Sequence, residues 1–143
     1  MEIAPAVVRA MTLELLDDSG SGTPLEAELR YNTRDPYAVV AHFRAGDTLV
    51  RWVFSRDLLA EGLYEPVGDG DVHVWPHLDA RGSAVVIVEL SSPHGEALLQ
   101  VRSNEVSEFL ALTREIVPVG HEGHHLDLDG VVAQLLAGTA DAA

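Results

Sequence analysis

The sequence contains no cysteine and no lysine, and all nine of its basic residues are arginine. The absence of cysteine excludes disulfides, thiolate metal sites and thiol catalysis. The longest purely apolar run in the middle of the chain, residues 84–88, is far shorter than the ~18 residues of a membrane-spanning helix. The first five residues lack the basic start and apolar run of a signal peptide. We therefore expect a cytoplasmic protein that does not insert directly into a membrane.

Positive charge is scarce along the whole chain. Nine arginines stand against 23 acidic residues, which gives a formal net charge of −14 at pH 7. Non-specific binding to nucleic acid requires several lysine or arginine contacts with phosphates, and a net charge of this sign repels DNA, RNA and anionic lipid at long range. A local arginine patch is compatible with this composition, although it would act against the average field. The charge therefore predicts no nucleic-acid partner.

The 143 residues are predicted to form a single domain, with a core over residues 7–137 and a short frayed C-terminal tail. In the first two-thirds of the chain, apolar and polar residues alternate with a period of two, which is typical of strands with one solvent-facing side. The predicted strands cover residues 7–15, 25–31, 37–44, 48–55, 71–75, 83–90 and 97–101. Because the strand over 83–90 is apolar on both faces, both should be covered. Residues 17–24 are predicted to be a loop.

Three helices are predicted from apolar residues at helical spacing. A short helix covers residues 56–63, with Gly62 near its end. A second begins after Ser103 or Asn104, either of which can cap it, and a Pro-Val-Gly segment stops it before residue 121. A third covers residues 128–137. Strands first and helices last predict an α+β fold with a mostly antiparallel β core, one short helix and two C-terminal helices.

Residues 121–125 (HEGHH) match the zinc-peptidase pattern H-E-x-x-H. That chemistry needs an α-helix, which places both histidines on one face and the glutamate beside the metal-bound water. Here the motif follows a Pro-Val-Gly segment and contains a glycine, so a solvent-exposed turn is predicted instead. Adventitious binding of a divalent metal by its histidines and Asp127 is the alternative. Two Asp-rich segments, 68–71 and 127–130, lack the spacing of a calcium loop.

Two aromatic pairs keep a nucleic-acid alternative open. Arg51 beside Trp52, or His73 beside Trp75, could form a stacking platform for single-stranded nucleic acid. Aromatic residues in strands are more often part of the core, and the net charge opposes this function. No nucleophile elbow, phosphate-binding loop or dinucleotide motif occurs in the sequence. The residues by themselves thus predict an acidic α+β domain without a catalytic site.

Four long segments together resemble a single protein family. They are residues 29–39 (LRYNTRDPYAV), 52–63 (WVFSRDLLAEGL), 68–76 (GDGDVHVWP) and 90–99 (LSSPHGEALL). These segments are similar to the SsgA-like sporulation and cell-division proteins of actinomycetes, closest to the SsgB-like branch, and the resemblance covers residues 7–137. It implies a barrel-like antiparallel core with helices, similar to the whirly-type architecture and assembled as a homotrimer.

The resemblance also implies a non-enzymatic role in septum formation during sporulation, without a metal or cofactor. SsgB-like members recruit the tubulin-like division protein FtsZ to septal sites and promote its assembly. The expected partners are therefore FtsZ and other SsgA-like proteins, and the expected location is the division septum. A single-stranded nucleic-acid-binding module is the alternative function.

The partner surface is predicted near the C-terminal end of the chain. It includes Gly120, Glu122, Leu128, Val131 and Leu135, and Gly120 is expected to supply a positive-φ turn that aims the last segment. All nine arginines lie at or before residue 114, so the chain beyond it is acidic. If this end meets a partner, the partner's face should be basic and the affinity should weaken with salt.

Overall fold

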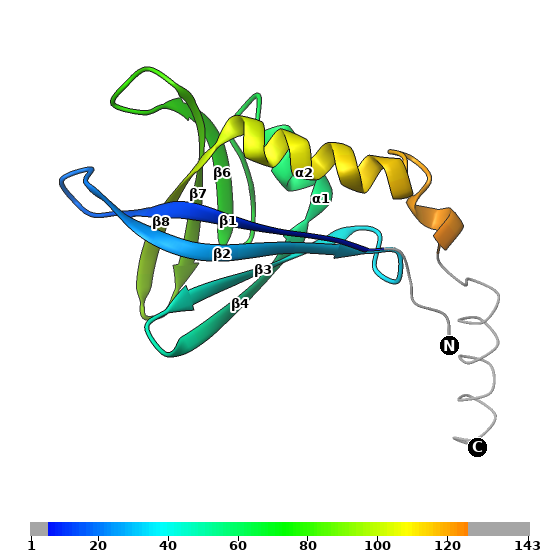
Figure 1. The fold of residues 1–143 in the computed structure, drawn as a ribbon, viewed down its shortest axis with the longest axis horizontal. Helices are drawn as coiled ribbons and strands as arrows, with labels where there is room; N and C mark the ends of the chain where they lie inside the picture. The colour runs from blue at the N-terminus through cyan, green and yellow to red at the C-terminus, as the bar shows by residue number, and fades with distance from the viewer. Residues whose placement is uncertain (1–5, 126–143) are drawn as a thin grey trace.

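The structure, a computed structural model, describes residues 6–125, in which eight antiparallel strands form one curled sheet with the shape of a half-barrel (Figure 1). The strands are β1 (Ala6–Leu16), β2 (Gly22–Asn32), β3 (Ala38–Ala45), β4 (Thr48–Ser55), β5 (Val67–Asp69), β6 (Val72–Leu78), β7 (Ala84–Ser92) and β8 (Gly95–Arg102). The helices are α1 (Arg56–Gly62), α2 (Ser103–Ile116) and the 3-10 helix η1 (Glu122–His125). The predicted α+β class and antiparallel core are confirmed, as are the short helix and the first of the two C-terminal helices.

The strand order is β4-β3-β2-β1-β8-β7-β6-β5. It consists of two meanders, β1–β4 and β5–β8, in which strands adjacent in sequence also pair. The meanders meet at one seam, where β1 pairs with β8 over only three residue pairs, centred on Leu15 and Leu99. The two edges of the sheet are consequently β4 and β5.

The buried core lies on the inner face of the curled sheet, and α2 covers this face by packing on β1, β7 and β8 (Figure 1). On β3, Val39, Ala41 and Phe43 are buried while the residues between them are more exposed, which confirms the period of two. Phe109 and Leu110 of α2 are completely buried against this face. The core therefore depends on docking of α2 as well as on the sheet.

Both faces of β7 are covered, as its sequence predicts. Val86 and Val88 belong to the core cluster, whereas Val85 and Ile87 alternate with them and are also buried. Trp75 of β6 is the cross-strand neighbour of Ile87 and is half-buried on that outer face. The outer face of this half of the sheet is thus partly buried from solvent.

The helix α1 begins at a side-chain cap and ends at a close contact. The Oγ of Ser55 accepts a hydrogen bond from the Leu58 amide at 2.9 Å. Gly62 does not form a left-handed end to the helix, because its own φ is not positive and the C-cap residue Leu63 is right-handed. A Cβ at Gly62 would instead lie 2.2 Å from Cγ1 of Val74, so the glycine is required for the approach of α1 to β6.

Three local predictions differ from the structure. Ser103 is already the first helical residue of α2, and the N-cap is Arg102 without a side-chain hydrogen bond, so capping by Ser103 or Asn104 is wrong. The first loop is shorter than predicted and β2 begins at Gly22, because Oδ1 of Asp17 accepts hydrogen bonds from two amides of a tight turn. The strand β5 is absent from the predicted strands, because three residues are too few to produce an alternating pattern.

The predicted helix over 128–137 lies outside the described residues. Within residues 6–125, no helix is both long and apolar enough to cross a membrane.

Candidate functional site

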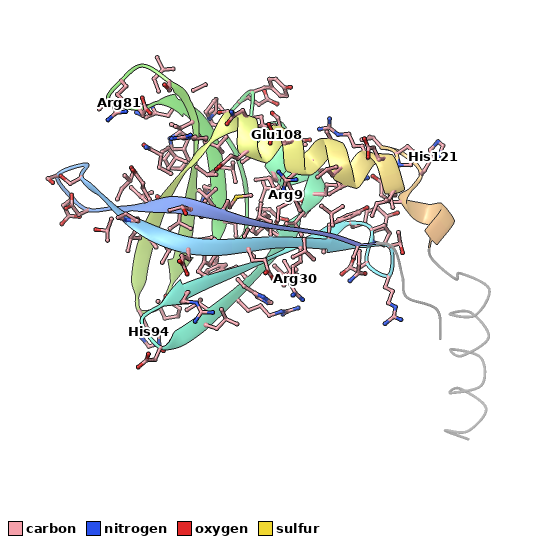
Figure 2. All side chains as sticks on the ribbon, in the orientation of Figure 1. Arg9, Arg30, Arg81, His94, Glu108 and His121 are labelled. Atoms are coloured by element: carbon pink, nitrogen blue, oxygen red, sulfur yellow. The ribbon has the colours of Figure 1, made fainter. Side chains whose placement is uncertain are left out.

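The predicted partner surface starts where α2 ends. Gly120 has a φ of +88°, so the expected positive-φ turn is confirmed. The His121 amide donates a hydrogen bond to the Pro118 carbonyl at 2.9 Å, which closes this turn next to the last turn of α2 (Figure 2). Three further predicted residues, Leu128, Val131 and Leu135, lie outside the described residues. The structure therefore brings together only the beginning of the predicted surface.

Glu122 is buried, which differs from the exposed turn predicted for this segment. Its Oε1 accepts a hydrogen bond from Nη2 of Arg56 at 2.8 Å, and the side chains of Arg56 and Glu122 are only 3% and 9% exposed. Arg56 is the first residue of α1, so this ion pair fastens the segment after α2 to the start of α1. Removing one partner of a buried pair leaves an uncompensated charge and is strongly destabilising.

The guanidinium of Arg56 has further partners at the end of α2. Its Nη1 donates to the Val117 carbonyl at 2.7 Å and, at 3.4 Å, to the Thr113 carbonyl. These carbonyls lie at the negative end of the helix dipole, where a cation is stabilising. The guanidinium also lies 5.0 Å from the ring centroid of Tyr31. We call Tyr31, Arg56, Thr113, Val117 and Glu122 the Arg56 cluster.

Two groups of the Arg56 cluster have shifted pKa values. A hydrogen bond from its own backbone amide, followed by the hydrogen bond from Arg56, lowers the pKa of Glu122 below its usual value. Burial raises the pKa of Tyr31, partly opposed by the charge of Arg56. The Tyr31 hydroxyl also donates to the Pro36 carbonyl at 2.9 Å. Glu122 is therefore ionised and Tyr31 protonated at neutral pH, which suits a structural clamp rather than proton transfer.

The HEGHH segment does not have the geometry of a zinc peptidase. Glu122 begins a four-residue 3-10 helix instead of lying within an α-helix, and its carboxylate is engaged by Arg56. His121 is exposed at the start of the segment. Among residues 6–123, whose side chains the structure describes, no three His, Asp or Glu side chains are grouped closely enough to hold a metal ion. The exposed-turn prediction is thus right for His121 and wrong for Glu122.

The proposed stacking platforms are not favoured by the strand geometry. Arg51 and Trp52 are neighbours in β4 and hence point to opposite faces of the sheet, with Trp52 packed against the core. His73 and Trp75 share a face, but Nδ1 of His73 lies 3.4 Å from Oε1 of Glu89, where a carboxylate repels phosphate. Neither pair presents the combination of a free cation and an open ring.

Sequence reasoning missed the central residue of this site, Arg56. A single arginine at the junction of a strand and a helix carries no periodic signal, and its partner Glu122 is 66 residues away. Exposed apolar side chains flank the cluster. Tyr37, whose carbonyl accepts a 2.7 Å hydrogen bond from the Arg56 amide, is 48% exposed, and Val119 is 66% exposed. Two exposed apolar side chains therefore lie in segments that are joined to the Arg56 cluster.

A family model described as "Streptomyces sporulation and cell division protein, SsgA" matches residues 25–122. The chain belongs to the SsgA family. The matched range ends at Glu122, so it contains every member of the Arg56 cluster. Sporulation-specific cell division protein SsgB of Streptomyces coelicolor is 50% identical over 126 residues, covering 87% of this chain and 91% of that protein. SsgB of Kineococcus radiotolerans is 48% identical, covering 89% and 78% of the two chains.

Solved structures of SsgA-family proteins have the same fold. One comes from work that relates mutations in SsgB to longitudinal cell division during sporulation of Streptomyces coelicolor; it is 46% identical, with a TM-score of 0.83 over 88% of this chain and 99% of that one. Another, an SsgA-like sporulation-specific cell division protein from Thermobifida fusca, is 36% identical, also with a TM-score of 0.83, over 94% and 98%. The similar relatives are named cell division proteins rather than enzymes.

Proposed function

We propose that this protein acts in sporulation-specific cell division as a non-enzymatic adaptor that recruits FtsZ to division sites and promotes assembly of the septum. The observation that carries the proposal is the 50% identity to a sporulation-specific cell division protein over 87% of the chain. Recruitment of FtsZ is what the resemblance to SsgB-like proteins implies. An adaptor needs a stable exposed surface and does not need a perturbed catalytic group.

The surface that suits this role begins at the end of α2. Arg56 anchors both ends of the segment 117–122 through the Val117 carbonyl and the Glu122 carboxylate, and Val119 within this segment is exposed to solvent. The chain then leads to the predicted contact residues Leu128, Val131 and Leu135. Because Glu122 is paired internally with Arg56, the acidic charge offered to a basic partner comes from other residues of this end, such as Glu115.

Several copies would strengthen a weak contact. A homotrimer presents each contact three times, which raises avidity without any new interaction. The trimer is testable by light scattering coupled to gel filtration, where the expected mass is three times the 15.4 kDa of the chain. A mass equal to one chain at micromolar concentration would contradict this part of the proposal.

Co-sedimentation with purified FtsZ polymers tests recruitment directly. The protein is expected to pellet with the polymers, to increase their light scattering, and to do so less well as salt rises. Val119→Ser, which removes the apolar side chain without adding charge, should weaken the effect, whereas Leu78→Ser at a similarly exposed apolar residue of β6 should not. A folded protein that leaves both sedimentation and scattering unchanged would refute recruitment of FtsZ.

Localisation tests the same proposal in cells. In a sporulating actinomycete, a fluorescent fusion is expected to reach the septal sites before FtsZ. It should then form a ladder of regularly spaced bands that coincides with FtsZ. Arrival after FtsZ would instead indicate a later step of septation and contradict recruitment.

A further inference from the structure

The edge strand β4 is long, apolar and open. Within residues 6–125, no strand pairs with its outer side. Leu49, Val50 and Val53 are 61%, 36% and 45% exposed, which is a high concentration of exposed large apolar side chains for one strand. The other edge, β5, has only three residues. Natural edges are commonly protected by lysine, proline or an inward-pointing charge, and β4 contains no lysine or proline.

The register of the β3–β4 hairpin identifies the free backbone groups. Ala45 pairs with Thr48 across a two-residue turn. In such a turn the carbonyl of the residue before it accepts a hydrogen bond from the amide of the residue after it. The backbone of Thr48 is thus hydrogen-bonded to β3, and so is the backbone of every second residue after it in β4. The intervening residues Leu49, Arg51 and Val53 direct their N–H and C=O groups away from β3. Their backbone therefore forms an unpaired template for another strand.

The side chains of β4 add specificity to this template. Leu49, Arg51 and Val53 form an apolar–cationic–apolar row on the outer face of the sheet. On the inner face, Val50 is exposed and Trp52 is half-buried beside it. A strand added here would need apolar side chains on its inner face and an anionic side chain opposite Arg51 on its outer face.

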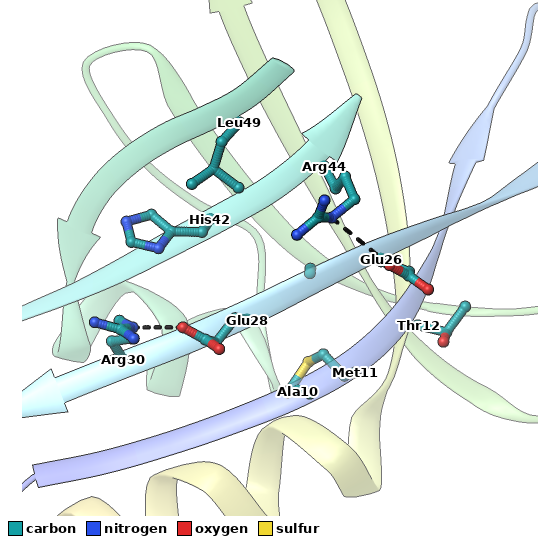
Figure 3. A pocket seen from close by; sticks show the side chains of 10 residues that line it. Ala10, Met11, Thr12, Glu26, Glu28, Arg30, His42, Arg44 and Leu49 are labelled. Atoms are coloured by element: carbon teal, nitrogen blue, oxygen red, sulfur yellow. Dashed lines mark hydrogen bonds and ion pairs between the residues drawn. The ribbon is translucent and has the colours of Figure 1, made fainter. Parts of the chain in front are cut away.

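Charge on the outer face singles out Arg51. A hollow of about 660 Å³ lies over β1 to β4, and Figure 3 shows two ion pairs along it. Arg30 pairs with Glu28, and Arg44 lies 3.9 Å from Glu26. Arg51 makes no ion pair with any described residue. This edge therefore offers an uncompensated cation in a protein of net charge −14.

We propose that β4 accepts an extended acidic segment of a partner protein as a ninth strand. The free backbone groups of Leu49, Arg51 and Val53 bond to it, and a carboxylate of the segment faces Arg51. A second copy of β4 fits less well, because β4 contains no acidic residue and antiparallel self-pairing near its centre brings two Arg51 side chains together. The inference concerns a surface separate from the Arg56 cluster and does not depend on the proposed recruitment of FtsZ.

The test uses the full chain and a fluorescein-labelled peptide, Ser-Thr-Val-Thr-Val-Glu-Val-Thr-Val-Ser, with a second peptide that carries lysine in place of glutamate. Fluorescence polarisation measures affinity, and hydrogen exchange followed by NMR measures amide protection. The glutamate peptide is expected to bind and to slow exchange at Leu49, Arg51 and Val53. Exchange at Val50 and Trp52 should change little, because their amides already bond to β3.

Variants separate the contribution of the Arg51 charge to peptide binding from that of the backbone hydrogen bonds. Arg51→Glu should weaken binding of the glutamate peptide by about tenfold and strengthen binding of the lysine peptide. Arg81→Glu, the same charge change in the β6–β7 turn, should leave both affinities unchanged. Val53→Pro removes one free N–H without breaking the hydrogen bonds between β3 and β4, and it should abolish peptide binding. Val53→Thr keeps this N–H and should retain peptide binding. Circular dichroism checks that each variant is folded; if Val53→Pro is not, the charge exchange at Arg51 decides alone.

Three outcomes would overturn the proposal. The first is that the glutamate peptide does not bind the folded protein. The second is equal affinity for both peptides, or amide protection confined to strands other than β4. The third is protection of β4 that increases with protein concentration in the absence of peptide, because the occupant would then be a second copy of the chain.

Discussion

The ion pair between Glu122 and Arg56 permits a quantitative prediction. Glu122→Gln keeps the size of the side chain but removes its charge, so the buried guanidinium loses its anionic partner. Breaking a buried pair from one side costs about 3–5 kcal/mol in general. Here Arg56 keeps the Val117 and Thr113 carbonyls and the face of Tyr31, and the new amide oxygen can still accept a hydrogen bond. We therefore expect a loss of about 2–3 kcal/mol in the free energy of unfolding.

Urea unfolding followed by circular dichroism measures this loss, and the melting temperature should fall by about 8 °C. Glu115→Gln is the matched control, because Glu115 is exposed on α2 and has no ion pair with a described residue. Its effect should stay within about 0.5 kcal/mol. If Glu122→Gln is as mild as the control, the Arg56 cluster does not hold the end of α2 and the reasoning is refuted.

The stability difference should also depend on pH. The pKa of Glu122 is lowered in the folded protein, so its contribution is fully present above the unfolded pKa, near 4.5, and is lost as pH falls through the folded value. The gap between wild type and Glu122→Gln should therefore be constant from neutral pH down to about pH 5 and narrow below it. A gap that widens on acidification would contradict the assigned sign.

Four further substitutions test the fold by the same unfolding assay. Phe109→Ala should cost about 3–5 kcal/mol, since this ring of α2 is completely buried in the core. Gly62→Ala should destabilise by about 1–3 kcal/mol despite better helix propensity, because its Cβ overlaps Val74, and Val74→Ala should relieve part of that cost. Gly120→Ala should cost about 1–2 kcal/mol from its φ of +88° alone, as no atom of the described residues, apart from its two chain neighbours, lies within 4 Å of the new Cβ. Ser55→Ala removes the cap of α1 and should cost about 1 kcal/mol. A neutral result for any of these would contradict the mechanism named for it.

The strands and α2 could be predicted because their signals are local. Alternation in β3 and the apolar run of β7 reflect burial on one or both faces, and burial repeats with the period of the element. The start of α2 was predicted wrongly because a serine or asparagine near a helix start can occupy either the cap or the first turn, and only the backbone decides. Gly62 is similar, since its role depends on Val74, which is distant in sequence.

The candidate site was predictable only in part. Gly120 could be identified because a glycine after a proline near a helix end is a recognisable turn signal. The burial of Glu122 could not, because it depends on Arg56 in a different element and on how α1 and α2 meet. A charged residue in a His-rich, glycine-containing segment is more often solvated, and nothing nearby in sequence indicates its partner. Sequence patterns therefore located the end of α2 but missed what holds it.

The short seam between β1 and β8 has a consequence for folding kinetics. Every other strand pair joins neighbours in sequence and can form early from local hairpins, whereas the seam closes a loop of about 80 residues for only three residue pairs. We expect the two meanders to form first and the β1–β8 junction to close late, together with docking of α2 on both meanders. Conservative truncations at Leu15 or Leu99 should then speed unfolding and leave the folding rate nearly unchanged. The half-barrel is thus expected to fold as two halves that join at one junction.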